Sequence, residues 1–151
     1  MALWREQLYT IMRHNATNAV DFFRLPASRV FEDEHTLVIM DIQSVNPGHV
    51  LVLVKPHRAN VYALEDELAG AVFRTAARMA RAAKAAFGCE GMTLLQANEK
   101  AGAQTVFHFH IHVLPRWEGD GMALAWPVKN PPREALEEMA VKLRAALQSV
   151  A

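Results

Sequence analysis

The segment VFHFHIHV, residues 106–113, concentrates side chains that can do chemistry. In a β-strand alternate side chains project from the same face, so a strand here would place imidazoles on one face and apolar side chains on the other. The imidazoles belong to His108, His110 and His112. Such a row fits three uses: the polar face of a half-exposed strand, a transition-metal site, or a nucleophilic histidine with flanking histidines.

Imidazole suits the nucleophilic use. Its unperturbed pKa of about 6.5 leaves most of it neutral, and therefore nucleophilic, at pH 7. Neighbouring imidazoles disfavour the charging of one another, which should keep the neutral form available. A second group must hold the other ring nitrogen to fix the tautomer, and the sequence does not identify that group.

The elements that would position these histidines follow from hydrophobic periodicity. Short apolar or alternating runs predict strands at residues 28–32, 36–40, 49–55, 92–97 and 106–114, with Pro115 ending the last one. An apolar stripe predicts one long helix over residues 64–87, followed by Gly88 as C-cap. Further helices are predicted at residues 2–12 and after Asn130-Pro131-Pro132. This order predicts an α+β domain with a five-stranded antiparallel sheet.

Length and composition narrow the possible classes of protein. A chain of 151 residues, 52% hydrophobic and 21% charged, predicts one soluble domain over residues 1–151. A formal net charge of zero gives no reason to expect a nucleic acid or a membrane as partner. No apolar run approaches the roughly 18 residues that a membrane span needs. Cys89 is the single cysteine, so we expect neither an internal disulfide nor a cysteine-based zinc site, and we expect a cytoplasmic location.

The flanks of the histidine row resemble a known family. Residues 98–117, NEKAGAQTVFHFHIHVLPRW, are similar to the signature of the histidine triad (HIT) family: an Asn, a Gly-containing loop, Gln with Ser or Thr, then histidines alternating with hydrophobic residues. Residues 40–58, MDIQSVNPGHVLVLVKPHR, resemble the family's segment around Pro-Gly-His. The resemblance covers roughly residues 20–122 and leaves residues 123–151 as a C-terminal extension. It implies the HIT fold and, together with the alanine-rich helix around residues 62–87, a homodimer.

The resemblance implies hydrolysis or transfer at the α-phosphate of a purine nucleoside phosphate conjugate. His110 would attack phosphorus and form a nucleotidyl-histidine intermediate. His112 and Thr105 match positions for leaving-group protonation and phosphate contact, and Gln104 matches one that contacts the phosphate bridge or positions water. The remaining histidines expected to flank the phosphate are His49 and His108. The substrate stays open between a dinucleoside polyphosphate, such as diadenosine tetraphosphate, and a nucleoside phosphoramidate.

Substrate-binding positions also follow from the resemblance. Asn98 matches a phosphate contact, Asp41 matches a ribose contact, and Ile39 and Ile42 match contacts to base or sugar. His57, like His35, lies outside these roles and is predicted to be a surface residue.

Metal and cofactor expectations differ from those of many family members. A Cys-x-x-Cys near the N-terminus helps many members to bind structural zinc, but this chain has VDFFRLP, residues 20–26, in its place, so we expect no zinc. We expect no required cofactor, with magnesium only as the companion of a polyphosphate substrate. Two alternatives stay open: a metal-binding β protein that uses the His-x-His-x-His row, and a nucleotide-binding module without turnover.

Overall fold

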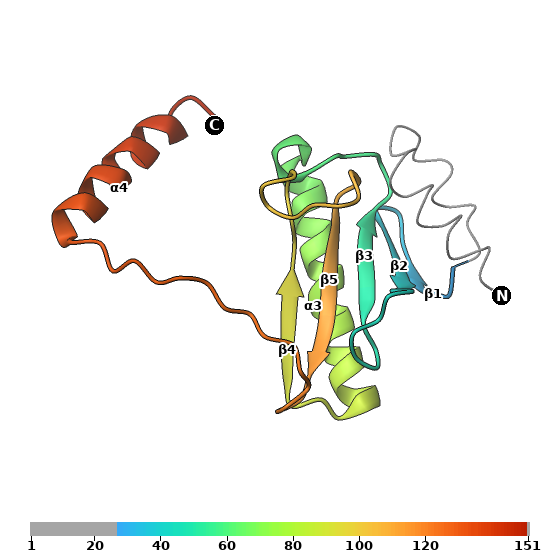
Figure 1. Cartoon of the computed structure of the whole chain (residues 1–151). Coiled ribbons are helices and arrows are strands. Elements are labelled where there is room, and N and C mark those ends of the chain that lie inside the picture. The colour runs from blue at the N-terminus through green and yellow to red at the C-terminus, as the bar shows by residue number, and fades with distance from the viewer. Residues whose placement is uncertain (1–26, 151) are drawn as a thin grey trace. The chain divides into compact units, whose positions relative to one another are not determined.

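The computed structural model describes residues 27–150. Within that range five strands form one sheet in the order β1-β2-β3-β5-β4, and every neighbouring pair is antiparallel (Figure 1). The predicted α+β fold with a five-stranded antiparallel sheet is therefore confirmed, and the first four strands lie within two residues of their predicted bounds. The strands are β1 (Arg29–Glu32), β2 (Thr36–Met40), β3 (Val50–Val54), β4 (Gly91–Leu95) and β5 (His110–Arg116).

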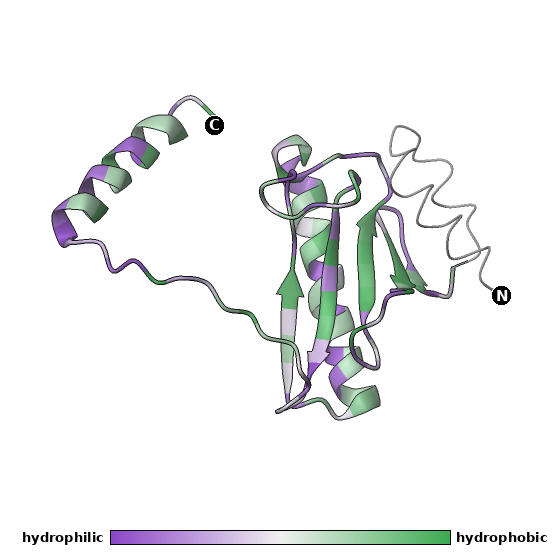
Figure 2. Cartoon of the chain, in the orientation of Figure 1, coloured by the Kyte–Doolittle hydropathy of each residue, from purple (hydrophilic) through white to green (hydrophobic). Residues whose placement is uncertain are grey.

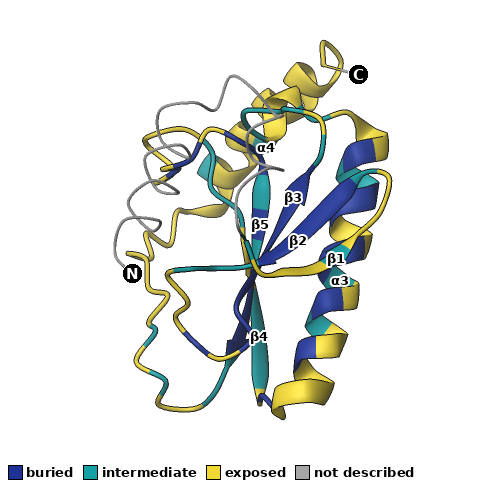
Figure 3. Cartoon of the chain, turned by 90° about the vertical axis from the view of Figure 1, so that its right-hand side faces the viewer, coloured by how far each residue is buried: buried dark blue, intermediate teal, exposed yellow. Residues whose placement is uncertain are grey.

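The long helix α3 (Asp66–Phe87) packs along one face of the sheet, against β2, β3 and β5 (Figure 3). A short 3-10 helix, η1 (Val61–Ala63), precedes it, so α3 begins two residues later than the apolar period predicted. It ends as predicted, because Gly88 adopts the left-handed conformation at φ 62° and donates its N–H to the Lys84 carbonyl. Its buried residues form one stripe: Leu68, Ala71, Val72, Thr75, Ala76, Met79 and Ala83.

Strand β3 is hydrophobic along its length (Figure 2), because the sheet carries an apolar cluster on each face. Toward α3, Val52 and Ile111 join a cluster with Val72 of the helix. On the opposite face, Leu51 belongs to a second cluster. Since Ile111 faces α3, the alternating His110 and His112 project from the face opposite the helix. The second cluster consists of Leu37, Ile39, Leu51, Leu53 and Val106.

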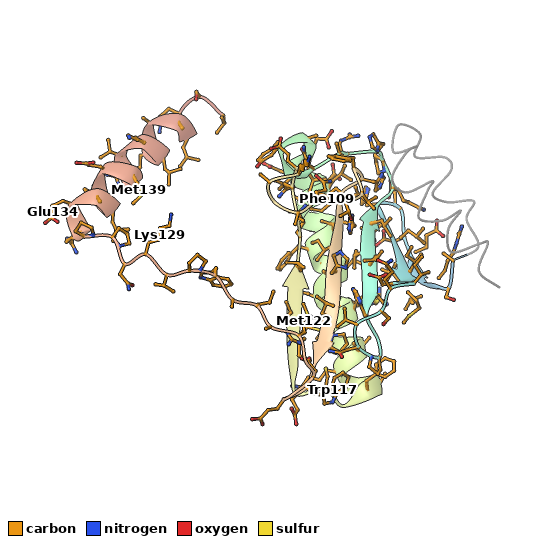
Figure 4. All side chains as sticks on the ribbon, in the orientation of Figure 1. Phe109, Trp117, Met122, Lys129, Glu134 and Met139 are labelled. Atoms are coloured by element: carbon orange, nitrogen blue, oxygen red, sulfur yellow. The ribbon has the colours of Figure 1, made fainter. Side chains whose placement is uncertain are left out.

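Strand β5 differs from its predicted bounds at both ends. It begins at His110 rather than at residue 106, because the preceding residues bond to the β3–η1 connection: Phe109, labelled in Figure 4, donates its N–H to the Arg58 carbonyl over 2.6 Å. It also continues through Pro115, which pairs with Met92 of β4. The Pro115 carbonyl points away from β4 and accepts a 2.8 Å hydrogen bond from the side-chain amide of Asn46, which precedes β3. In an antiparallel strand the N–H and the carbonyl of one residue point to the same side, so the N–H that proline lacks would not have bonded to β4.

The chain divides after Gly121 into two compact units. The second unit, residues 122–151, contains the predicted last helix as α4 (Arg133–Leu147), on which Figure 4 labels Glu134 and Met139. None of the residues of α4 is buried, and Leu143 on its predicted apolar stripe is 67% exposed. The helix predicted at residues 2–12 lies outside the described residues. Between residues 27 and 150, no helix is long and apolar enough to cross a membrane.

Candidate active site

His110 begins β5, and a backbone oxygen fixes the tautomer of its ring. Its Nδ1 lies 2.7 Å from the carbonyl oxygen of His108. A carbonyl oxygen only accepts hydrogen bonds, so Nδ1 carries the hydrogen and Nε2 keeps a free lone pair when the ring is neutral. The group that the sequence did not identify is therefore the main chain two residues upstream. An imidazole held in this way offers a nucleophilic nitrogen in a fixed position.

Three side chains from separate segments meet beside His110. The Nδ1 of His112 on β5 and the Nε2 of His49, just before β3, lie 2.9 Å apart. Asp41, just after β2, places Oδ2 3.2 Å from His49 Nε2 and 3.5 Å from His112 Nδ1. The adjacency of β2, β3 and β5 brings them together. The expected grouping of His49, His110 and His112 is present, and Asp41 joins it.

The backbone also sets the tautomer of His49. The N–H of Val45 donates to His49 Nδ1 over 3.3 Å, so the neutral ring carries its hydrogen on Nε2. That hydrogen points into the cluster, where His112 Nδ1 is closer than Asp41 Oδ2. With His49 donating to its Nδ1, neutral His112 has its own hydrogen on Nε2.

Burial and charge set the protonation states of the cluster. Burial lowers the pKa of His110, and the hydrogen bond to the His108 carbonyl opposes burial only in part. Burial also lowers the pKa of His49, although the carboxylate of Asp41 opposes it. Burial raises the pKa of Asp41, but the neighbouring imidazole of His112, the hydrogen bond from the Gln43 N–H and the imidazole of His49 together outweigh burial and lower the pKa overall. At neutral pH, neutral His49 and His110 therefore lie beside ionised Asp41.

A small open pocket of about 70 Å³ gives access to the cluster. It includes the predicted residues Thr105 and Ile42, whereas Ile39 is buried in the apolar layer at 6% exposure. A larger cavity of about 290 Å³ lies between α3 and the strands β4 and β5, but none of the described residues that line it is titratable, so the chemistry points to the smaller pocket. The smaller pocket is lined by Asp41, Ile42, Gln43, Leu51, Thr105, Val106, His110 and His112.

Gln104 lies next to the pocket residue Thr105, but its side chain bonds to the main chain. It is 6% exposed. Its Oε1 accepts from the Glu99 N–H at 2.7 Å, and its Nε2 donates to the carbonyls of Ala59 at 2.6 Å and Val106 at 2.9 Å. These bonds give Gln104 a role in shaping the loop that carries Thr105. Its expected contact with the phosphate bridge or with water stays a prediction.

Asn98 likewise organises the start of this loop. Its Oδ1 accepts from the Val61 N–H at 2.8 Å, and its Nδ2 donates to Gln96 Oε1 at 2.6 Å. The loop closes tightly on it, since a Cβ at Gly102 would lie 2.2 Å from the Asn98 carbonyl oxygen. The glycine of the sequence motif is thus needed for close approach of the backbone. The expected phosphate contact of Asn98 stays a prediction.

His108 is separate from the pocket. It is 1% exposed, its Nε2 donates to the Val54 carbonyl at 2.7 Å, and its Nδ1 lies 3.2 Å from Nδ1 of His57. Burial lowers the pKa of His108 to about 4, and the repulsion of positive charge by His57 and His110 adds to this. The expectation that all three histidines line one strand face is wrong for His108, because β5 begins only at His110. His57, predicted as a surface residue, is half-buried and bonded to His108.

A metal site is the rival use of these histidines. Among the described residues the donor atoms that converge belong to Asp41, His49 and His112, so only one member of the His-x-His-x-His row takes part. A metal on His49 Nε2 would move the hydrogen of the neutral ring to Nδ1, where it would face the Val45 N–H. Metal-binding histidines generally donate their other N–H to an acceptor. The hydrogen bonds therefore favour a proton-handling network over a metal centre.

The sheet order, the covering helix and the histidine cluster define an α+β domain built around a histidine site. The family model for the HIT domain matches residues 23–119. The chain belongs to the HIT family, which confirms the resemblance noted in its sequence. A second match, to the K+ potassium transporter C-terminal domain, covers residues 1–39 and is too short to assign a family.

Relatives with sequence and structural similarity agree with this assignment. The chain is 42% identical over 103 residues to "Protein hit" of Bacillus subtilis, covering 68% of this chain and 71% of the relative. It is 30% identical over 125 residues to adenosine 5'-monophosphoramidase HNT1 of Saccharomyces cerevisiae, covering 82% of this chain and 77% of the relative. The crystal structure of a HIT family protein from Bacillus anthracis superposes with a TM-score of 0.78 at 34% identity, covering 91% and 94% of the two chains.

Proposed function

We propose that this chain is a nucleotide hydrolase or transferase that cleaves at the α-phosphate of a nucleoside phosphate conjugate through a nucleotidyl-His110 intermediate. The observation that carries the proposal is the hydrogen bond from His110 Nδ1 to the His108 carbonyl, which leaves a lone pair on Nε2 at the pocket. His110 Nε2 attacks phosphorus as the bond to the leaving group breaks. Water then attacks phosphorus and releases the nucleoside monophosphate and His110.

The neighbouring pocket residues have separate tasks in this reaction. His112 gives a proton to the leaving group in the first step and takes one from water in the second. Thr105, exposed on the same pocket, offers a hydroxyl to the phosphate. Asp41 and Ile42 lie at the same opening and are available to the ribose and base.

A purine nucleoside phosphoramidate is the substrate class that we favour, since the yeast relative is named as an adenosine 5'-monophosphoramidase. Dinucleoside polyphosphates are the second class. The reaction needs no cofactor, because the nucleophile and the proton donor are both side chains, and magnesium would only accompany a polyphosphate. A side-by-side assay of adenosine phosphoramidate and diadenosine tetraphosphate distinguishes the two classes.

Trapping the intermediate tests the proposal. The enzyme is mixed with a substrate that has a good leaving group, quenched at alkaline pH, and digested for peptide mass spectrometry. We expect a nucleotide adduct on His110, and we expect His110→Ala to lose turnover by at least about 10³-fold while still binding adenosine monophosphate. An adduct on another residue, or no turnover of any substrate despite nucleotide binding, would contradict the proposal and favour a binding module.

We also propose that the protein is a homodimer that pairs through the β4 edge of the sheet. Within residues 27–150, β4 has a strand neighbour on only one side, and Leu94, Leu95 and Phe73 are 37%, 39% and 59% exposed beside the 290 Å³ apolar cavity. An open edge with an apolar surface favours pairing with another copy. Light scattering at micromolar concentration should give a dimer mass for the natural chain and a monomer mass for Leu95→Lys. A monomer mass for the natural chain would contradict this proposal.

A further inference from the structure

The turn that carries His49 is anchored through the side chain of its first residue. Residues 46–49 form a β-turn between β2 and β3, in which the His49 N–H donates to the Asn46 carbonyl at 3.1 Å. Gly48 follows Pro47 and has φ 83°, as the third residue of a type II turn does. Because His49 is the last residue of this turn, a group that holds Asn46 also determines where the imidazole of His49 lies.

Asn46 is buried, and its amide donates both of its hydrogens away from the turn. Its Nδ2 lies 2.8 Å from the Pro115 carbonyl oxygen and 2.9 Å from Oδ2 of Asp120. Asp120 lies three residues after Trp117, which Figure 4 labels just beyond the end of β5. The first residue of the turn is therefore tied to the loop that follows β5.

Arg116 holds the carboxylate of Asp120 in a fixed orientation. The guanidinium reaches Asp120 Oδ2 and Oδ1 through two nitrogens, at 2.5 Å and 2.8 Å, and this two-point geometry fixes the plane of a carboxylate. Arg116 also donates to Thr93 Oγ1 of β4 at 3.2 Å. The Asp120 side chain is 6% exposed, so few water molecules compete with Asn46 for its oxygens. Asp120 is thus a buried acceptor supported by both β4 and β5.

The contact most sensitive to this anchor is the hydrogen bond that orients the ring of His49. Val45, the neighbour of Asn46, donates its N–H to His49 Nδ1 over 3.3 Å, at the long limit of hydrogen-bond distances. Without the acceptor at Asp120, one buried N–H of Asn46 would be unpaired, which is costly, so the turn would shift toward another acceptor. A shift of a few tenths of an ångström would break the bond from Val45. The ring of His49 would then leave its 2.9 Å contact with His112.

We infer that Asp120 is a positioning residue for His49 and that it acts through Asn46. The carboxylate fixes the turn, and the turn fixes the imidazole that contacts His112 beside His110. The inference rests on the proposed function, because it gives Asp120 a task in placing the histidines around the nucleophile. Asp120 itself does not line the pocket, so its effect on the reaction is indirect.

Two substitutions remove the anchor formed by Asn46 and Asp120. Asp120→Asn places an amide where Asn46 needs an acceptor and removes the charge that Arg116 holds. Asn46→Asp keeps a residue that favours turns but cannot donate to Asp120, so it tests the anchor even if Asp120→Asn does not fold. Glu118→Gln is the matched control, since it converts an exposed carboxylate of the same loop to an amide and should leave kcat unchanged. Thermal unfolding identifies the variants that are folded.

A double-mutant cycle tests whether Asp120 acts through His49. The value of kcat for adenosine phosphoramidate is measured for the natural chain, Asp120→Asn, His49→Gln and the double variant. We expect Asp120→Asn to lower kcat by about 10-fold or more in the natural chain, because small displacements of groups around a reacting centre are costly. In the His49→Gln chain the same substitution should lower kcat by less than about 2-fold, because the group that it displaces is already absent.

Long-range ¹H–¹⁵N spectra at pH 7.5 supply a readout that needs no activity. The ¹⁵N shift of His49 Nδ1 reports the hydrogen bond from Val45. In Asp120→Asn and Asn46→Asp this shift should move toward the value of a nitrogen that accepts no hydrogen bond, whereas Glu118→Gln should leave it unchanged.

The outcomes separate this inference from the proposed function. An unchanged His49 Nδ1 shift in both anchor variants would overturn the inference. An unchanged kcat for Asp120→Asn, or an equal loss of kcat in the natural and His49→Gln chains, would overturn it as well. A natural chain that turns over no substrate and forms no His110 adduct would count against the proposed function instead, and the His49 shift would still decide the inference.

Discussion

Acidification should destabilise this protein through His108, a buried histidine that does not line the pocket. Its Nε2–H donates to the Val54 carbonyl and its Nδ1 faces His57, inside a site from which water is excluded. Protonation would add a hydrogen to Nδ1 in a buried position. For that reason burial lowers the pKa of His108 to about 4 in the folded state, whereas in the unfolded chain the ordinary value is about 6.5.

The size of the effect follows from proton linkage. Between pH 6.5 and pH 4 the unfolded chain binds a proton at His108 and the folded state does not, so the free energy of unfolding falls as the pH falls. The slope is about 1.4 kcal/mol per pH unit, which gives about 3 kcal/mol over the interval. The folded state keeps this stability of about 3 kcal/mol in full above about pH 6.5 and loses it as the pH approaches 4. His49 and His110, whose pKa values are also lowered, add losses of the same sign.

A matched pair of variants isolates the contribution of His108. His108→Gln keeps an amide N–H for the Val54 carbonyl but cannot be protonated, and His35→Gln changes a histidine on the β1–β2 turn. Urea unfolding from pH 7.5 to pH 4, followed by circular dichroism at fixed protein concentration, gives the free energy of unfolding at each pH. His108→Gln should lose about 3 kcal/mol less than the natural chain over this range, whatever its stability at pH 7.5. Parallel curves for all three chains would refute the argument.

Two further predictions concern packing and buried hydrogen bonds, both measured by urea unfolding at pH 7.5. Leu53→Ala leaves a cavity at a site that is 1% exposed and should lower the free energy of unfolding by about 2–5 kcal/mol. The control Leu136→Ala, on the exposed helix α4, should change that free energy by less than about 0.5 kcal/mol. Similar losses for the two variants would contradict the assigned core. Thr75→Val removes a hydroxyl that shares a 3.0 Å hydrogen bond with Thr36 and should lower the free energy of unfolding by about 1 kcal/mol. Thr75→Ser should keep the hydrogen bond. An unchanged free energy of unfolding for Thr75→Val would show that this hydrogen bond does not stabilise the fold.

The sequence predicted the sheet well because local patterns and tertiary packing agree there. The unbroken apolar run of β3 indicated a strand buried on both faces, and both faces carry an apolar cluster. It failed at β5 because alternation at residues 106–109 is compatible with a strand, whereas Phe109 bonds to Arg58 in a distant connection. Pro115 was predicted to end the strand, but β5 continues through it, because the side of the strand on which proline lacks an N–H faces Asn46 rather than a neighbouring strand.

The grouping of the candidate site residues was predicted in part for a similar reason. Residue types and order indicated His110, His112 and His49, and the structure brings these three together. The bonds that direct their hydrogens come from the main chain, at the His108 carbonyl and the Val45 N–H. The residue types at those positions do not indicate such bonds, since every residue offers the same backbone carbonyl and every residue except proline offers the same N–H. They became visible only with the fold.

The backbone bond to His110 also affects how mutations at position 108 can be interpreted. Any residue there still has a carbonyl group, so His110, the proposed nucleophile, can keep its partner while the side chain of residue 108 is replaced. A loss of activity in such a variant would then report displaced main chain between β3 and β5, not a missing chemical group. Substitutions by apolar residues of different size, such as His108→Val and His108→Phe, would therefore measure how much displacement of the backbone at residue 108 the activity assigned to His110 tolerates.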